Sequence, residues 1–343
     1  MIAVVAIVGL GACATTISPS PAPTASSGAT ATAAPTVTPA ALPSPTEGLP
    51  TIDGTRTTGP DLPQPRSEHA AAALDGWIYA AGGFIDRQTS ASFVGLDVGG
   101  GASAWVELAP LPEPRDHTAL VAVNGSVYAI GGAILGLGRI GDNVWRFDPA
   151  ANAWTSVAPL PRARAFHAAT VLDGAIYVVG GVERPHDRPT PTLRYDPASD
   201  AWAELAPILV EREHLGAASL DGLVYAISGR FASNLGAVEA YDPATDAWTS
   251  LPDLPTPRSG IAAVVLEGRV HVFGGEQVDP LALFDEHEVY DPASATWFAA
   301  PLMPRGRHGV GAVAIDDRIY VVAGGPSPDL SSSDRLDIFE LAE

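Results

Sequence analysis

Six arginines recur along the chain at nearly constant spacing, and of all its residues they are the best suited to hold a charged ligand. Successive members are 49, 49, 48, 46 and 49 residues apart. A guanidinium group is a planar fork of N–H donors that matches a carboxylate through two parallel hydrogen bonds. Gathered at one channel mouth, these groups would form a ligand-binding site that favours an anion. The six residues are Arg66, Arg115, Arg164, Arg212, Arg258 and Arg307.

A structural role for the same arginines is the alternative that the sequence leaves open. One arginine per repeat could join neighbouring repeats through backbone carbonyls or a carboxylate. A binding site usually breaks the symmetry of a repeat, whereas this pattern obeys it. The symmetry therefore favours the structural role.

Five of the six arginines are followed within three residues by a histidine, which raises the question of a metal site. A metal site would need three or four of these side chains at a fixed geometry, but their distance from the arginine differs between repeats. We therefore expect no metal site and no cofactor. The run Asp285 to Glu288 is a second candidate for a cation, although charge runs are more often solvated, and we favour a solvated strand entrance. The histidines are His69, His117, His167, His214 and His308.

No catalytic motif is visible in the sequence. It has no Gly-x-Ser-x-Gly motif, no phosphate-binding loop and no paired cysteines, since Cys13 is its only cysteine. Glycoside cleavage needs two facing carboxylates, and the sequence does not show which acidic residues converge. Catalytic residues therefore stay unassigned. Acidic candidates in predicted loops are Asp86, Asp142, Glu183, Asp187, Glu276 and Asp279.

The arginines belong to a unit that is written six times in the chain. A tryptophan stands ten residues before every arginine except the first, and a turn follows each arginine after nine residues. A double glycine or its remnant ends a β-prone run, and Tyr-Asp-Pro or a similar triplet comes later in four copies. Six copies at a period near 50 residues indicate a repeat architecture. The tryptophans are Trp105, Trp154, Trp202, Trp248 and Trp297.

This unit resembles the kelch repeat, whose copies form four-stranded blades of a β-propeller. The resemblance implies an all-β fold with six four-stranded antiparallel blades over residues 51–343. The sixth copy stops at Glu343 without a fourth strand. We expect the segment from Asp53 to Thr58, with Arg56 in place of the tryptophan, to supply that strand and close the ring.

Alternating strand direction places the arginines and the loops after the double glycines on one face of the propeller. These loops vary in length and sequence while the blades do not, as expected of a scaffold that carries a site on its loops. The resemblance adds that kelch domains use arginines at this position to hold acidic peptides or sugars. The loops span residues 84–92, 133–142, 182–191, 230–237, 276–286 and 326–335.

The N-terminal 50 residues predict export rather than a folded domain. The apolar run from Ile2 to Leu10 is too short to span a bilayer, which takes about 20 residues. It ends in Leu10-Gly11-Ala12-Cys13, which looks like a bacterial lipobox with Cys13 as the lipidation site. Residues 14–50 are rich in Ala, Thr, Pro and Ser and predict a disordered tether. We expect an exported cell-envelope protein with a signal peptide at 1–13, and a plain secretory signal is the alternative.

The composition narrows the range of partners. The formal net charge is −20, and nearly all of it lies after residue 50. An acidic surface disfavours nucleic acid and anionic membranes, so we expect membrane contact only through the lipid anchor. We expect a monomer.

Two functions stand open at this stage. The first is a tethered module that binds a protein or a glycan, including an anionic one, and it is favoured because no catalytic constellation is visible. The second is a sugar mutarotase or epimerase, because blade number, export and the arginines resemble the kelch-type N-acetylneuraminate epimerase. Mutarotation needs only a positioned acid and base. The chemistry of kelch-type copper oxidases is excluded, since it needs a tyrosine crosslinked to a cysteine of the propeller.

Overall fold

The computed structural model describes residue 46 and residues 48–184, 189–328 and 330–342. The predicted signal segment, Cys13 and the predicted tether up to residue 45 lie outside this part of the chain. In the described part no helix is long and apolar enough to span a membrane.

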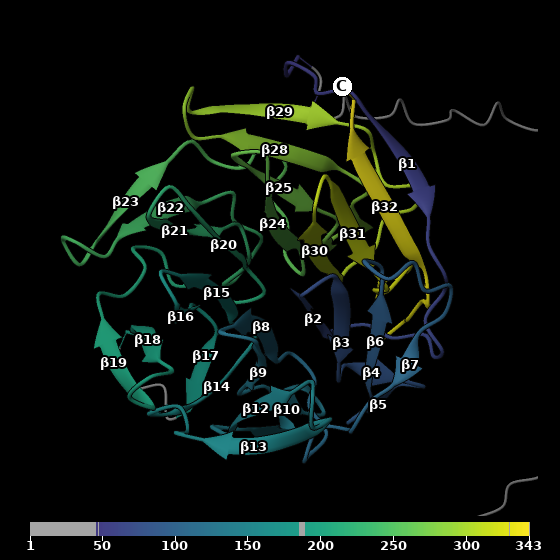
Figure 1. Cartoon of the computed structure of the whole chain (residues 1–343). Coiled ribbons are helices and arrows are strands. Elements are labelled where there is room, and N and C mark those ends of the chain that lie inside the picture. Colours follow the sequence, from purple (N-terminus) through teal and green to yellow (C-terminus); the bar gives the residue numbers. More distant parts are fainter. Residues whose placement is uncertain (1–45, 47, 185–188, 329, 343) are drawn as a thin grey trace, which may run out of the picture. The chain divides into compact units, whose positions relative to one another are not determined.

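The chain from Ser44 onward forms one compact unit of six four-stranded antiparallel sheets arranged around an axis. Figure 1 shows β2, β8, β15, β20, β24 and β30 around the centre and β7, β13, β19, β23, β29 and β1 at the rim. The predicted six-bladed propeller is confirmed.

The blades are numbered here along the chain, with strands given from the centre outward. Blade 1 has β2 (Ala70–Leu74), β3 (Trp77–Ala81), β6 (Phe93–Asp97) and β7 (Val106–Glu107). Blade 2 has β8 (Ala119–Val123), β9 (Ser126–Ile130), β12 (Val144–Asp148) and β13 (Ala153–Val157). Blade 3 has β15 (Ala168–Leu172), β16 (Ala175–Val179), β18 (Thr192–Asp196) and β19 (Ala201–Leu205). Blade 4 has β20 (Gly216–Leu220), β21 (Leu223–Ile227), β22 (Val238–Asp242) and β23 (Ala247–Leu251); blade 5 has β24 (Ala262–Leu266), β25 (Arg269–Phe273), β28 (His287–Asp291) and β29 (Thr296–Ala300); blade 6 has β30 (Gly311–Ile315), β31 (Arg318–Val322), β32 (Leu336–Leu341) and β1 (Gly54–Thr58).

Blade 6 closes the ring with strands from both ends of the propeller. β1 pairs antiparallel with β32, from Gly54 opposite Leu341 to Thr58 opposite Asp337. This confirms the predicted closure. The outer strand of blade 6 thus comes from the start of the domain, and β32 has no free edge.

The tryptophans link each blade to its neighbour through one repeated hydrogen bond. The indole N–H of Trp154 donates to the carbonyl of Ala109, in the linker that leads into its own blade, at 2.8 Å, and four other tryptophans make the equivalent bond at 2.9–3.0 Å. In blade 6, Arg56 stands at this position and its Nε donates to the carbonyl of Pro301 at 3.0 Å. Arg56 therefore replaces the indole N–H, as its alignment with the tryptophans predicts.

The double glycines bring each blade against the next. The second glycine donates its N–H to the carbonyl of the next blade's arginine in all six blades, at 2.8–3.1 Å. Gly180 has a positive φ of 60°, and a Cβ there would lie 2.7 Å from the carbonyl oxygen of Arg212. In blade 6 the equivalent pair is Ala323-Gly324, because Gly324 donates to Arg66. The double glycine of the sixth copy, Gly324-Gly325, is thus displaced by one residue relative to the other blades, as its place in the sequence indicates.

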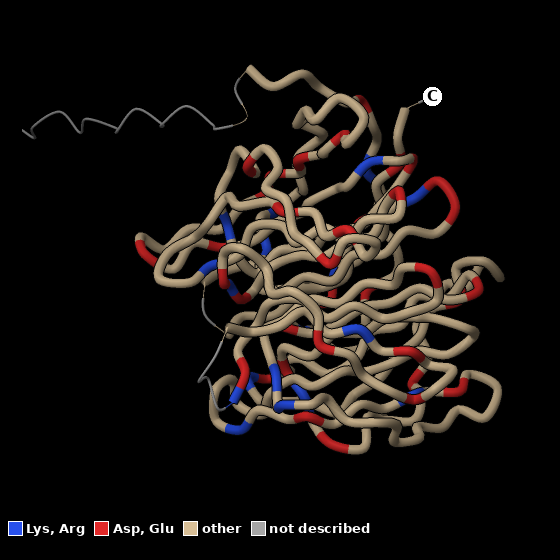
Figure 2. Tube along the Cα trace, turned by 90° about the vertical axis from the view of Figure 1, so that its left-hand side faces the viewer, with Lys and Arg blue, Asp and Glu red and all other residues tan. Residues whose placement is uncertain are grey.

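Packing explains the small residues of the inner strands and the aromatic residues between the blades. The inner strands carry Ala and Gly because they converge on a narrow central cavity, of about 160 Å³, which they line. Hydrophobic clusters such as the one around Tyr79, Phe93 and Phe147 fill the space between neighbouring blades. In the side view of Figure 2, acidic residues are scattered over the turns of the propeller, in keeping with the chain's net charge of −20.

A pair of buried histidines lies between blades 5 and 6. Nδ1 of His271 is 2.9 Å from Nε2 of His287, and Nη2 of Arg56 donates to Nδ1 of His287 at 3.0 Å. Burial lowers the pKa of His271 to about 3 and the pKa of His287 well below its ordinary value. The nearby charges of Arg56, Arg269 and Arg258 act in the same direction. Both rings are therefore neutral in the folded state at neutral pH.

This pair predicts a loss of stability in mild acid. Because the folded-state pKa of His271 is depressed, the unfolded chain takes up protons first as the pH falls below about 6.5, and stability falls with it. At pH 5 the cost is about 2 kcal/mol for His271 alone, at 1.36 kcal/mol per pKa unit. We expect the melting temperature to drop between pH 7 and pH 5, and to drop less in the His271→Leu/His287→Phe variant. An identical drop in that variant would show that other groups cause the acid sensitivity.

Candidate functional site

The second residue after each arginine belongs to a closed ring of backbone hydrogen bonds at one end of the central channel. Each of these residues donates its N–H to the carbonyl of its equivalent in the preceding blade, at 2.9–3.2 Å, and the ring closes from Glu68 back to Gly309. All six have a positive φ, between 49° and 67°. We call this set the mouth ring: Glu68, His117, Phe166, His214, Gly260 and Gly309.

The mouth ring is symmetric in its backbone but not in its side chains. Left-handed φ values are uncommon for residues with a Cβ, and strained positions of this kind cluster at functional sites. Blades 5 and 6 supply glycine, and a Cβ on Gly309 would overlap the carboxylate of Glu68. Gly309 therefore leaves the space into which the Glu68 side chain fits.

The loops after the double glycines lie beside this ring, as the strand order predicts. The residue directly after each arginine pairs with the residue that follows the glycine pair, for example Glu213 with Arg230 and Ser259 with Glu276. In blade 3 the pairing extends into two short strands, β14 (Ala163–Ala165) and β17 (Val182–Arg184). The predicted common face is confirmed.

A pocket of about 440 Å³ opens above the mouth ring. Its floor is polar and its wall, contributed by loops, is apolar. The volume falls within the range of about 300–1,000 Å³ that is typical of small-molecule sites. The floor residues are Glu68, His117, His214, Arg230, Glu276 and His308. The wall residues are Phe84, Val278, Leu281, Pro328 and Leu330.

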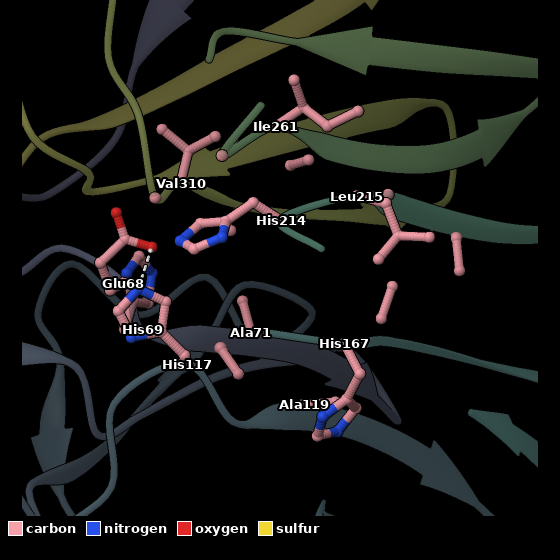
Figure 3. Close-up of a pocket in the computed structure, with 18 of the residues that line it drawn as sticks. Glu68, His69, Ala71, His117, Ala119, His167, His214, Leu215, Ile261 and Val310 are labelled. Carbon is pink, nitrogen blue, oxygen red and sulfur yellow. Dashed lines mark ion pairs between the residues drawn. The ribbon is translucent and has the colours of Figure 1, made fainter. Parts of the chain in front are cut away.

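Two imidazole–carboxylate pairs define the floor. Nδ1 of His117 donates to Oδ1 of Asp116 at 2.7 Å, and Nδ1 of His214 donates to Oε2 of Glu213 at 2.6 Å. The two rings are 4.9 Å apart between centroids. Figure 3 shows Glu68, His117 and His214 gathered at one end of the channel, with the Glu68–His117 ion pair drawn.

Charged partners complete the network. Arg230 donates from Nε to Glu213 at 2.7 Å, from Nη1 to Glu276 at 2.9 Å and from Nη2 to Nε2 of His214 at 3.1 Å. His308 donates from Nδ1 to Oε1 of Glu68 at 2.8 Å. Each ionisable group of the floor therefore has an oppositely charged or hydrogen-bonding partner.

These contacts set the charge states. Burial opposes a charge on His117, but the carboxylates of Glu68 and Asp116 raise its pKa to about 9. Burial lowers the pKa of His214 despite its bond to Glu213. Burial would raise the pKa of Glu68, yet His117 and His308 hold that pKa well below its usual range.

Comparison with known proteins agrees with the propeller fold. The family model of the KLHDC2/KLHL20/DRC7 kelch-repeats domain matches residues 51–181, and the kelch motif matches residues 163–208 and 211–255. The chain belongs to the kelch-repeat family. Among solved structures, the structure of YjhT is similar with a TM-score of 0.70 and 17% sequence identity, covering 82% of this chain and 96% of YjhT. A search of curated protein sequences finds no match.

The arginines of this kelch propeller do not line the pocket. All six are at most 2% exposed and lie inside their blades. Arg212 donates to the carbonyls of Ser228, Ala226 and Val210, and Arg258 pairs with Glu288. This arrangement favours the structural alternative. A ligand-binding role for Arg66, Arg115, Arg164, Arg212, Arg258 and Arg307 stays a prediction.

The expectation of a solvated strand entrance at residues 285–288 is wrong in part. His287 is 1% exposed and Glu288 is fully buried, since they open β28, an interior strand of blade 5. Glu288 is the partner of Arg258, so a charge run here marks an internal ion pair. Whether such charged residues are exposed or buried depends on the position of their strand in the blade, which the run of charges itself does not reveal.

Sequence reasoning missed Glu68, Glu213 and Arg230. Aligning the repeats on the arginine would have exposed the first of them, because the second following residue is Glu, His, Phe, His, Gly and Gly in blades 1 to 6. His117 and His214 share that position, whereas His69 and His167 come one residue later. The histidine spacing looks irregular because the histidines occupy different positions of the repeat. Those at the second residue after the arginine, His117 and His214, converge at the mouth ring.

Proposed function

We propose that this kelch propeller binds a small, neutral, hydroxyl-rich ligand, of the size of a monosaccharide unit of a glycan, in the mouth pocket. The observation that carries the proposal is a single pocket with a hydrogen-bonding floor and an apolar wall. Sugars present hydroxyl groups and apolar C–H patches, so both surfaces find a partner. Pockets with a largely apolar lining and a few convergent polar groups are typical ligand sites.

A neutral ligand fits better than the anion suggested by the arginine spacing. Arg230, which lies at the pocket, is already paired with Glu213 and Glu276. The guanidinium groups of the six repeat arginines are buried within the blades. The carboxylates of Glu68 and Glu276 line the pocket and would accept hydrogen bonds from hydroxyl groups, while they would repel an anion.

A calorimetric titration and a thermal-shift screen with neutral monosaccharides, N-acetylated sugars and N-acetylneuraminate test the proposal. At 100 times its dissociation constant a true ligand adds about 2.7 kcal/mol of stability. Leu281→Arg, at a wall residue that is 68% exposed, should abolish binding without loss of folding. Leu302→Arg, at a site outside the pocket that is 53% exposed, is the matched control and should bind normally. Binding that survives Leu281→Arg would place the ligand elsewhere.

A second candidate function is carbohydrate isomerisation, in keeping with the resemblance to the kelch-type epimerase. The observation in its favour is the placement of two imidazole–carboxylate pairs on the floor of one pocket, an arrangement suited to move protons between two atoms of a sugar. Exchange spectroscopy of sugar anomers with and without the protein separates the two functions. Acceleration at micromolar protein would make the module an enzyme, and its absence would leave it a binding protein.

Attachment to the cell envelope is the part of the proposal that rests on sequence alone. Cys13 would carry the lipid and residues 14–50 would hold the propeller away from the membrane. Incorporation of labelled palmitate at Cys13 tests this attachment, and a secreted, unlabelled product would refute it.

A further inference from the structure

Three donor groups of the mouth ring and its pocket converge in a way that the proposed ligand does not require. One donor atom each from Glu68, His117 and His214 lies within 4.8 Å of the other two. Their side chains are 10%, 9% and 6% exposed, and they come from blades 1, 2 and 4. The geometry points to a binding site for one divalent transition-metal ion of the zinc type at Glu68, His117 and His214.

The groups behind the two imidazoles support this assignment. His117 and His214 each donate Nδ1–H to a carboxylate, Asp116 and Glu213, at 2.7 and 2.6 Å. Histidines that bind metals through Nε2 almost always donate the other ring N–H to a carboxylate or carbonyl, which fixes the tautomer and the ring orientation. His69 and His167, which line the channel next to the ring, have no such carboxylate partner in the described structure. His308 also donates Nδ1–H to a carboxylate, but that carboxylate is Glu68, itself one of the three donors. Only His117 and His214 of these histidines combine a separate carboxylate partner with a place in the cluster.

The donor set determines the class of metal. Two imidazole nitrogens and one carboxylate oxygen suit Zn²⁺, Co²⁺ or Ni²⁺, whereas Ca²⁺ and Mg²⁺ prefer sites built of oxygen atoms. Three protein donors leave a fourth position free, as in catalytic zinc sites. Glu68, His117 and His214 all line the mouth pocket, so this position is accessible from the pocket.

Arg230 is one competitor that the metal must displace, and the proton that the neighbouring carboxylates hold on His117 is the other. Its Nη2 lies 3.1 Å from Nε2 of His214, the atom that would bind the metal. The Arg230 side chain is 22% exposed and belongs to a loop, so it has room to move away. Removing its charge should tighten metal binding, by roughly tenfold or more, because a guanidinium repels a divalent cation at this distance.

The test uses the full chain without an affinity tag, stripped of metal by a chelator and dialysed against Zn²⁺ or Co²⁺, with Mg²⁺ as the negative control. We expect one Zn²⁺ or Co²⁺ per chain by elemental analysis, visible absorption bands typical of bound Co²⁺, and no Mg²⁺. His214→Gln should lose binding by about 100-fold or more, and Asp116→Asn by about 10- to 100-fold, the range for groups that orient a ligand. Arg230→Met should bind more tightly than the unmodified chain.

His167→Gln is the matched control, since His167 is a buried histidine of the same channel outside the cluster. It should bind metal normally, and melting curves of every variant establish that it is folded. If His214→Gln does not fold, Glu68→Gln replaces it. No stoichiometric Zn²⁺ or Co²⁺, or binding unaffected by these substitutions, would overturn the assignment. No sugar enters this experiment, so its outcome is independent of the proposed glycan binding, and Leu281→Arg should retain the metal.

Discussion

Replacement of Arg212 by methionine is expected to lower stability by about 3–5 kcal/mol, because it leaves a buried carboxylate without its cation. Arg212 and Glu239 are 0% and 1% exposed at their side chains and are joined at 2.6 Å. The same guanidinium satisfies three backbone carbonyls, those of Val210, Ala226 and Ser228. For a domain of this size the loss corresponds to a fall of about 10 °C in melting temperature.

Two further variants serve as controls for Arg212→Met. Arg212→Met/Glu239→Leu removes both charges and should recover much of the loss, since the unpaired carboxylate is the larger penalty. Arg318→Met breaks the Arg318–Glu340 pair, whose side chains are 48% and 34% exposed, and should cost at most about 1 kcal/mol. If Arg212→Met melts like Arg318→Met, the buried arginines contribute little to stability and their recurrence needs another explanation.

In this propeller, residues that repeat from blade to blade hold the blades together, whereas the pocket is built from residues that differ between blades. Two repeated contacts are the same wherever they occur: glycine N–H groups bind arginine carbonyls in all six blades, and tryptophans bind linker carbonyls in five. The pocket instead uses the position where the blades differ. Glu68, His117 and His214 share one place in the repeat yet have different neighbours, and they therefore form a cluster that occurs once among the residues that the structure describes.

The sequence predicts the fold well because its signals are local and repeated six times. Strand ends, turns and the replacement of tryptophan by Arg56 all follow from the alignment of one copy on another. The floor of the pocket could not be predicted in the same way. It depends on left-handed backbone at the mouth ring, which turns Glu68 and His214 from blades 1 and 4 toward one another. Side-chain direction at such a position does not follow from strand alternation.

The burial of charge is the second quantity that the sequence did not reveal. Glu239, Glu288 and Asp337 stand in the third strands, and each is at most 1% exposed because it pairs with a repeat arginine. Each is the second residue of its strand, 27 residues after the arginine for Glu239 and 30 residues after it for Glu288 and Asp337. The sequence does not show that an acidic residue at this position faces the interior. Only the register of the sheet brings the two groups together.

A chain that begins at residue 60 is expected to melt about 10 °C or more below the full domain, because it lacks β1. β32 then exposes an unpaired edge from Leu336 to Leu341, and Phe339, fully buried in the intact ring, loses the guanidinium of Arg56 that lies 5.0 Å from its ring centre. Open strand edges also promote association between chains.

A chain that begins at residue 46 keeps β1 and is the matched control for that truncation. It should melt like the full chain, and size-exclusion chromatography should show self-association only for the shorter chain. Arg56→Ala in the full chain is the milder probe of the same closure. It removes the hydrogen bond to Pro301 but keeps the β1–β32 ladder, so it should fall between the two truncations. An unchanged melting temperature after loss of β1 would mean that five blades and three strands hold the ring without closure, and that stability resides in the contacts between neighbouring blades alone.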